Sequence, residues 1–111
     1  MTQLIELSQG DYGYTITCTL YTADDTAVAE NLSAASSVSL DITRLDETPI
    51  VNDATVTVSD AANGQVQFTP AATWFTAANL DGRSHYVAIF KINYASGAKH
   101  TFKIPVYVHQ H

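Results

Sequence analysis

Apolar and polar residues alternate one by one along most of this 111-residue chain. A period of two is typical of β-strands that bury one face and leave the other in water. The clearest run is Tyr12 to Tyr21, where Tyr14, Ile16, Cys18 and Leu20 share the face predicted to be buried. The same pattern predicts strands over Leu4–Ser8, Ser37–Arg44, Ala54–Ser59, Gln65–Thr69, Tyr86–Tyr94 and Lys99–His109, with a short pairing segment at Ile50-Val51. The core-facing residues predicted on the later strands are Val38, Leu40, Ile42, Val56, Val58, Val66, Phe68, Tyr86, Ala88, Phe90, Ile92, Phe102, Ile104, Val106 and Val108.

A glycine turn at Asp81-Gly82 leads into the most apolar strand, Tyr86–Tyr94. Leu80-Asp81-Gly82 followed by Tyr86 resembles the tyrosine corner of immunoglobulin-type sandwiches, in which an inward Tyr hydrogen-bonds a nearby backbone group through its hydroxyl. We therefore predict an all-β fold, an immunoglobulin-like antiparallel β-sandwich of roughly seven to eight strands. The length fits a single domain over residues 1–111.

Two local signals mark strand ends. Asn63-Gly64 lies between two alternating runs, and because both residues tolerate positive φ it predicts a short hairpin. Pro105 removes a backbone donor from the last strand, which is therefore expected to be an edge, at least locally.

Two connections are predicted to close the core. Residues 22–35 read as a polar connection in which Val28 and Leu32 plug the edge of the core. Residues 71–78, which contain Trp74-Phe75, read as a short helical turn or a wide loop that caps the sandwich.

Composition narrows the classes of partner. The net charge is −6, and the five Lys and Arg residues are scattered, so no basic stripe exists and nucleic acid is not an expected partner. No apolar run approaches membrane-spanning length and no signal peptide is visible, so the protein is expected to be made in a cytoplasm, without a membrane partner. The single cysteine, Cys18, has no partner for an internal disulfide.

Metal sites are weak alternatives here. His109 and His111, with His100 nearby in the predicted sheet, offer nitrogens that could bind zinc. Zinc needs three or four converging ligands. Histidines that are simply solvated at the end of the chain are an equally good explanation of this pattern. Loop acids could serve calcium, yet they do not follow a calcium-loop spacing and suit turn chemistry better. These acids are Asp24, Asp25, Asp46, Glu47, Asp53 and Asp60. We predict no metal and no cofactor.

No catalytic constellation stands out. Cys18 could act as a nucleophile with His85 or His100 as its base, but its place in the inward row of a strand favours a buried, inert thiol. No phosphate-binding loop and no serine-nucleophile motif occurs. The protein is therefore not expected to be an enzyme, and a small cell-wall hydrolase fragment is the weakest reading.

Aromatic residues are the candidates for contact with a partner. Trp74 and Phe75 could form a surface patch for sugar or protein, although closing the core is the favoured role for Trp74. Tyr21 and Tyr107 point outward in the predicted strands, and Tyr is enriched at interfaces.

Several segments together carry a resemblance to a known family. The segments read L-I-E-L-S-Q-G-D-Y-G-Y-T-I, L-S-A-A-S-S-V-S-L, D-A-A-N-G-Q-V-Q-F-T-P, Y-V-A-I-F-K-I and K-I-P-V-Y-V. Their order is similar to that of the N-terminal domain of upper baseplate proteins of tailed bacteriophages, and to related immunoglobulin-like modules on phage heads and fibres. Those baseplate proteins continue into a helical linker and a distal domain, whereas this sequence stops at His111.

The resemblance implies a non-enzymatic structural protein of the phage virion. We expect a small docking or decoration module on the capsid, the baseplate or the base of a fibre, acting through an edge strand or the loops at one end. Its partners would be other virion structural proteins, with the module monomeric in isolation and arrayed on the particle. The alternative is a carbohydrate- or receptor-binding module that uses the surface aromatics Trp74 and Phe75.

Overall fold

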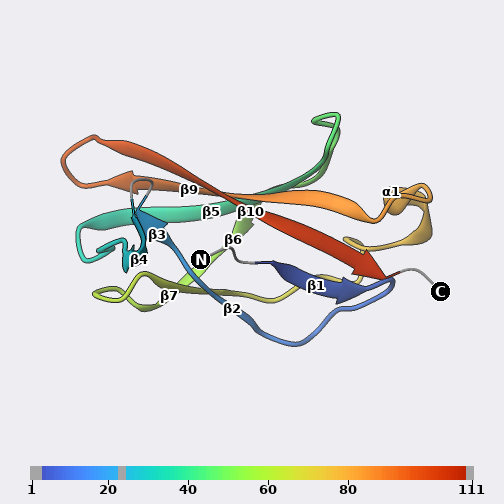
Figure 1. Ribbon diagram of the computed structural model, residues 1–111, viewed down its shortest axis with the longest axis horizontal. Helices are drawn as coiled ribbons and strands as arrows, with labels where there is room; N and C mark the ends of the chain where they lie inside the picture. Colours follow the sequence, from blue (N-terminus) through green and yellow to red (C-terminus); the bar gives the residue numbers. More distant parts are fainter. Residues whose placement is uncertain (1–3, 23–24, 110–111) are drawn as a thin grey trace.

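The computed structural model describes residues 4–22 and 25–109 (Figure 1). In that part of the chain, ten strands and one short helix follow one another. The strands are β1 (Ile5–Ser8), β2 (Ile16–Thr19), β3 (Tyr21–Thr22), β4 (Asp25–Ala29), β5 (Ala35–Arg44), β6 (Pro49–Thr55), β7 (Thr57–Asp60), β8 (Gln65–Phe68), β9 (His85–Tyr94) and β10 (Lys99–His109), and the helix is α1 (Ala77–Leu80).

Two sheets face each other across the core, which confirms the predicted β-sandwich. The larger sheet has the order β1-β10-β9-β5-β6, and the smaller one has the order β2-β8-β7. This partition matches the immunoglobulin arrangement, in which strands B, E and D oppose strands G, F and C. One pair departs from a purely antiparallel sandwich, because β1 runs parallel to β10.

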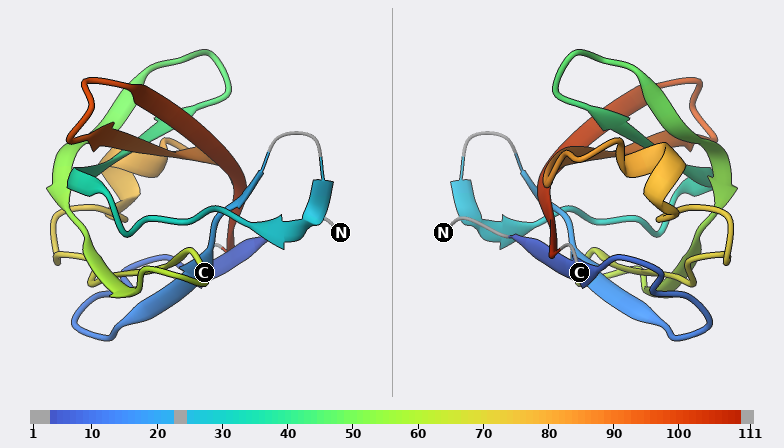
Figure 2. Two further views of the ribbon diagram at one scale, coloured as in Figure 1. Left: turned by 90° about the vertical axis from the view of Figure 1, so that its left-hand side faces the viewer. Right: turned by 90° about the vertical axis from the view of Figure 1, so that its right-hand side faces the viewer.

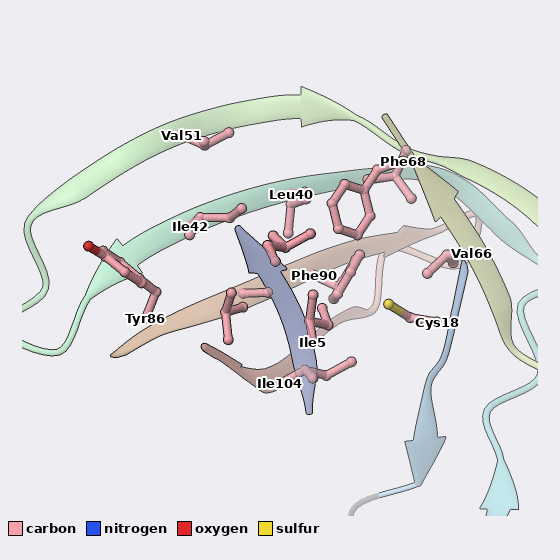
Figure 3. Close-up of a cluster of buried hydrophobic side chains, with 14 of the residues drawn as sticks. Ile5, Cys18, Leu40, Ile42, Val51, Val66, Phe68, Tyr86, Phe90 and Ile104 are labelled. Carbon is pink, nitrogen blue, oxygen red and sulfur yellow. The ribbon is translucent and has the colours of Figure 1, made fainter. Parts of the chain in front are cut away.

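Strand β9 is the centre of the larger sheet and supplies the middle of the core. Its inner row is fully buried and contains Tyr86, Ala88, Phe90 and Ile92, as the alternation predicted. Leu40 and Ile42 of β5 pack beside this row, with Val66 and Phe68 of β8 arriving from the opposite sheet (Figure 3). Val38, Val58 and Phe102 were predicted inward and are only partly buried against the same cluster.

The predicted strand from Tyr12 to Tyr21 is shorter than its alternation suggested. It begins at Ile16, and Tyr14 points outward with 43% of its surface exposed, so the inward placement of Tyr14 was wrong. The reason is local, because Gly10 and Gly13 both adopt positive φ and turn residues 9–15 into a loop. Cys18 and Leu20 are buried as predicted.

The predicted strand Ala54–Ser59 is divided at Val56. Strand β6 ends at Thr55 in the larger sheet, and β7 begins at Thr57 in the smaller sheet. Val56 is buried at this crossing between layers.

The connection predicted over residues 22–35 contains a small hairpin in which β3 pairs with β4. Val28 of β4 is 49% exposed, so its predicted role as a core plug was wrong, since the hairpin projects beside the sandwich (Figure 2). Leu32 is buried as predicted, and its backbone N–H donates to the Ala61 carbonyl over 2.8 Å.

The hairpin predicted at Asn63-Gly64 joins β7 to β8. Only Gly64 has a positive φ, of 67°, while Asn63 donates from its side-chain amide to Asp60. Gly64 is buried, and a Cβ there would lie 2.7 Å from the carbonyl oxygens of Leu20 and Glu30. The glycine therefore serves both the turn and the close approach of a neighbouring backbone.

Strand β10 is an edge over only part of its length. β1 pairs with Val106–His109, whereas the stretch from Lys99 to Ile104 is paired only with β9 among the described residues. The expectation of an edge that is at least local is therefore confirmed for the first half of the strand, and β1 covers the second half.

The tyrosine corner forms at the start of β9. The buried Tyr86 hydroxyl lies 3.0 Å from the Leu80 carbonyl oxygen and 2.6 Å from that of Arg83, and can donate to either. Gly82 lies in the turn between them with a φ of 73°. Two bonds from the Arg44 guanidinium to the Asn79 carbonyl oxygen attach the same corner to β5.

One end of the sandwich is closed by α1 and the segment before it (Figure 2). Thr76 caps the helix by accepting a hydrogen bond from the Asn79 N–H. Phe75 is fully buried there, in agreement with a capping role for this segment. No helix among the described residues is long and apolar enough to cross a membrane.

The tyrosine corner generates a stability prediction. Tyr86→Phe should lower the free energy of unfolding by about 0.5–1.5 kcal/mol, the net contribution of one hydrogen bond. Tyr86→Ala should lower it by about 3–5 kcal/mol, because it also leaves a cavity. Urea denaturation followed by tryptophan fluorescence measures both. An unchanged midpoint for Tyr86→Phe would mean that the hydroxyl contributes nothing to the corner.

A second prediction concerns the β7–β8 turn. Gly64→Ala should cost more than about 3 kcal/mol, because its Cβ meets two backbone oxygens and its φ is unfavourable for alanine. Asn63→Ala is the matched control and should cost about 1 kcal/mol or less, since Asn63 is exposed and has ordinary φ. Thermal melting of the two variants compares them directly, and equal losses would contradict the backbone-approach argument.

Candidate functional site

The most exposed aromatic side chain in the described residues lies in the loop between β1 and β2. We call residues 9–15 the tyrosine loop. Tyr12 is 62% exposed and Tyr14 is 43% exposed. The loop lies at the end of the sandwich that also carries α1 (Figure 1).

Hydrogen bonds attach the tyrosine loop to the segment that connects β8 to α1. The Gly10 N–H donates to the Phe75 carbonyl over 2.9 Å, and the Gly13 N–H donates to the Pro70 carbonyl over 3.0 Å. Because Phe75 and Pro70 are both buried, the loop is fastened to the core at both of these points. Its tyrosines are therefore presented on a preformed backbone.

Asp11 organises the interior of the loop. One oxygen of its carboxylate accepts from the Ser8 backbone N–H at 2.7 Å and from the Tyr14 hydroxyl at 2.8 Å. Partial burial, together with Asp11, raises the pKa of Tyr14 to about 12. Tyr14 therefore stays neutral at physiological pH, and the charge of Asp11 is directed at internal donors.

The surface next to the tyrosine loop has few charges. Thr69 lies beside Thr15, their hydroxyl oxygens 3.4 Å apart, and residues 71–73 are exposed. No residue from position 69 to position 80 is charged. We call residues 9–15 and 69–73 together the loop-end surface. Exposed tyrosine with few charges is the composition found in the centre of protein–protein interfaces.

The aromatic patch predicted from Trp74 and Phe75 is not a surface platform. Phe75 is 0% exposed, so its role as a contact residue was wrong, because its ring fills the end of the core. Trp74 is partly buried and stacks on Phe68 with ring centroids 6.1 Å apart. Its indole therefore packs on a core residue, which favours the lid role over the sugar-binding role.

The other two predicted contact residues lie away from this patch. Tyr21 is partly buried in β3, and Tyr107 is partly buried on the outer face of β10. The ring of Tyr107 lies between those of His85 and His109, with centroid distances of 5.2 and 4.6 Å. Among the described residues, no ring contact joins either tyrosine to Trp74.

The histidines are found in two separate places. His109 lies 3.4 Å from the Glu6 carboxylate on the outer sheet face. His100 lies 3.4 Å from Glu30, whose carboxylate also accepts a 2.6 Å hydrogen bond from Tyr94. His111 of the predicted zinc set falls outside the described residues. Within residues 4–22 and 25–109, no three potential ligands gather at a site that could hold a metal.

The loop acids are engaged in turns and ion pairs. Asp46 accepts from the Thr48 N–H and pairs with Arg83, and these hydrogen bonds, led by Thr48, lower the pKa of Asp46 to about 2. Asp53 pairs with Lys91, and Asp60 accepts from Asn63. The predicted calcium residue Asp24 lies outside the described residues, and the side chain of Asp25 is not described. Asp46, Asp53 and Asp60 therefore serve local structure, and Glu47 is exposed at a turn position with a φ of 70°.

Cys18 is enclosed by the core. Its side chain lies with Val66 and Phe90 in the buried cluster, and only 5% of the residue is exposed (Figure 3). Burial raises the pKa of the thiol to about 11, so the nucleophilic thiolate is scarce near neutrality. His85 and His100 are both exposed, outside this enclosure.

Sequence reasoning missed the tyrosine loop as a candidate site because it assigned Tyr12 and Tyr14 to a strand. The signal was present in the spacing of Gly10 and Gly13 around Asp11, a combination typical of turns. The alternation that continues from Tyr14 to Leu20 predicts a strand instead.

Comparison with known proteins supports the fold. No protein-family model matches the chain, and no curated protein matches its sequence significantly. Among solved structures, CopC from Methylosinus trichosporium OB3b is similar, with a TM-score of 0.53 over 96% of this chain and 84% of the CopC chain. The sequence identity is 10%, so this likeness concerns the β-sandwich fold alone.

The burial of Cys18 generates a reactivity prediction. At pH 8 the native protein should react with Ellman's reagent at least about 100-fold more slowly than the urea-unfolded protein, because the buried thiol is both protonated and shielded. Raising the pH from the unfolded thiol pKa of 9.0 towards the folded value of about 11 should lower stability, since only the unfolded thiol ionises readily. A Cys18→Ala control should lose less stability over this pH range, and the loss that remains should come from tyrosines such as Tyr14, whose pKa is also raised by folding. Rapid native labelling would contradict the enclosed position.

Proposed function

We propose that this protein is a non-enzymatic docking module of a bacteriophage virion, which binds another structural protein of the capsid, baseplate or fibre base. The observation that carries the docking role is the tyrosine loop, with Tyr12 62% exposed on a backbone tied to the Phe75 and Pro70 carbonyls. A preformed loop loses little conformational freedom on binding, so more of its contact energy contributes to affinity.

The composition of the loop-end surface supports a protein partner. Tyrosine is a frequent hot-spot residue, and the absence of charge from position 69 to position 80 lowers the cost of removing water. The exposed residues 71–73 are small, so they would allow close approach of a partner around the larger tyrosine.

The virion assignment rests on the sequence resemblance. Its first segment contains Q-G-D-Y-G-Y, which is the tyrosine loop itself. The segment that resembles the phage modules therefore coincides with the most exposed aromatic surface. On a particle, many weak copies of such a contact would act together, so a module that is monomeric in isolation could still remain attached.

Further support for a non-enzymatic role comes from the residues with catalytic potential. The thiol of Cys18 is buried, and His85 and His100 are on the surface apart from it. The histidine contacts that the structure describes are with carboxylates and aromatic rings, an arrangement that suits structural packing.

The proposal is tested by assembly of the virion. Mass spectrometry of purified particles should detect the protein, and Tyr12→Ala should reduce its incorporation by at least about tenfold, as expected for a tyrosine hot spot worth about 2 kcal/mol. Thermal stability should stay within about 0.5 kcal/mol of the wild type, because Tyr12 is a surface residue.

Val28→Ala is the matched control, since Val28 is also about half exposed but lies in β4, away from the loop-end surface. It should leave incorporation unchanged. If mature particles lack the protein, the virion role is wrong. If the protein is present and Tyr12→Ala is incorporated normally, the docking surface lies elsewhere.

A further inference from the structure

We propose that the open half of β10, from Lys99 to Lys103, binds an extended acidic segment of a partner protein as an added β-strand. This contact would be separate from the tyrosine loop and goes beyond the docking role proposed above. Such strand addition joins backbone to backbone, and the side chains on either side of the strand select the sequence.

The first observation is the direction of the backbone groups on β10. Its even-numbered residues bond to β9, as shown by the Val108 N–H donating to Ser84 and the Ala98 carbonyl accepting from Tyr94. Its odd-numbered residues face the other way, since the His109 carbonyl accepts from Gln9 after β1. The amides and carbonyls of Lys99, Thr101 and Lys103 therefore point to the sheet edge.

The second observation is that β1 leaves this edge open. It pairs with β10 only from Val106 onward (Figure 1). Pro105 has an edge-facing nitrogen without a hydrogen, so the ladder with β1 loses a donor there. Among the described residues no segment pairs with the edge from Lys99 to Lys103, and all three edge-facing residues are exposed.

The edges of β6, β7 and β2 are less regular or shorter. β6 begins at Pro49, and its register with β5 shifts twice, once across Asp53, which has a φ of 50°, and once between Val51 and Pro49. β7 also contains a register shift, and β2 spans four residues. The pairing of β10 with β9 shows no shift along its length, so its free half is a straight template.

The charges on this edge identify the chemistry of the partner. The other three cations are engaged, because Arg83 pairs with Asp46, Lys91 pairs with Asp41 and Asp53, and Arg44 donates to a backbone carbonyl. In the described residues, Lys99 and Lys103 have no acid within ion-pair distance. They occupy one face of the strand on either side of Thr101, so a paired strand would place acidic residues opposite both.

The same lysines argue against a second copy of this chain as the occupant. In an antiparallel pair centred on Thr101, Lys99 of one copy would lie directly opposite Lys103 of the other. Like charges in directly opposed positions are destabilising. The edge is therefore guarded against self-pairing while it remains suited to an acidic strand.

The test uses a five-residue probe, acetyl-Glu-Val-Thr-Val-Glu-amide, added to the intact protein at low ionic strength. Its sequence is a palindrome, so it places glutamates opposite both lysines in either strand direction. Hydrogen exchange measured by NMR should slow at least about threefold at Thr101 and Lys103 when the peptide is in excess. The amides of His100 and Phe102 already bond to β9 and should change little, which provides an internal control.

Two variants separate the charge contribution from the backbone contribution. Lys99→Glu/Lys103→Glu should weaken binding of the acidic probe by at least about tenfold and allow binding of acetyl-Lys-Val-Thr-Val-Lys-amide. Thr101→Pro removes the central edge-facing N–H and should abolish protection at Lys103, whereas the matched control Thr101→Val should retain it. Circular dichroism confirms that each variant is folded.

The proposal would be supported if the acidic probe protects the edge amides of the wild type, and if the Lys99→Glu/Lys103→Glu variant binds the basic probe instead. Absence of protection in the folded wild type would overturn it, as would equal binding of the acidic and basic probes. Self-association at the same edge, detected by sedimentation, would identify a second copy as the occupant and would also overturn it. None of these outcomes depends on whether the protein is found in virions.

Discussion

The structure depends on the burial of one continuous row of side chains on β9. Tyr86, Ala88, Phe90 and Ile92 are all withdrawn from water, and β9 pairs along its length with both β5 and β10. Removing this apolar surface from water is the main favourable contribution to folding, and it requires the smaller sheet to cover the row. The register of the larger sheet follows, since a slip by one residue would expose the whole row.

The tyrosine corner transmits this constraint to one end of the molecule. The Tyr86 hydroxyl donates to the carbonyl of Leu80 or of Arg83, and the Arg44 guanidinium donates to the carbonyl of Asn79. The segment before α1 then places Phe75 in the core, and the Phe75 carbonyl receives the Gly10 N–H of the tyrosine loop. The proposed docking loop is thus connected to the core through a short series of backbone contacts. Exposed tyrosines can be presented in a defined position only because buried residues fix the backbone beneath them.

The unpaired strand edges show a second constraint. A free edge is a template for uncontrolled pairing, and this protein limits it in several ways. β6 is interrupted by the left-handed conformation of Asp53, and the open half of β10 carries two lysines and ends at Pro105. The features of β10 also determine which strands could be added at its open edge. The backbone of the open half remains regular, and its lysine side chains favour acidic residues on the added strand. Protection against self-association and selection of a partner can therefore come from the same side chains.

Much of the architecture could be read from the sequence. The alternation of β9 and β10 identified their buried rows, Leu80-Asp81-Gly82 with Tyr86 indicated the corner, and Asn63-Gly64 located a turn. These features depend on residues close together in the chain, where side-chain period and backbone preference act directly. The candidate site was predictable only in part. The glycines around Asp11 indicated a loop, but the alternation of apolar and polar residues predicted that Tyr14 belongs to a strand.

The remaining features were decided by the tertiary structure. The crossing at Val56, the parallel pairing of β1 with β10, and the exposure of Val28 all depend on which distant segment lies nearby. A period of two tells which residues share a face, but it does not tell which sheet the face belongs to or where pairing stops. Those outcomes are set by hydrogen bonds and packing between residues far apart in sequence, such as Gly10 with Phe75 and Ile5 with Val106. The sequence by itself therefore determined most of the strands and most of the core residues, and the packing of distant segments against one another determined where strands end and which surfaces are exposed.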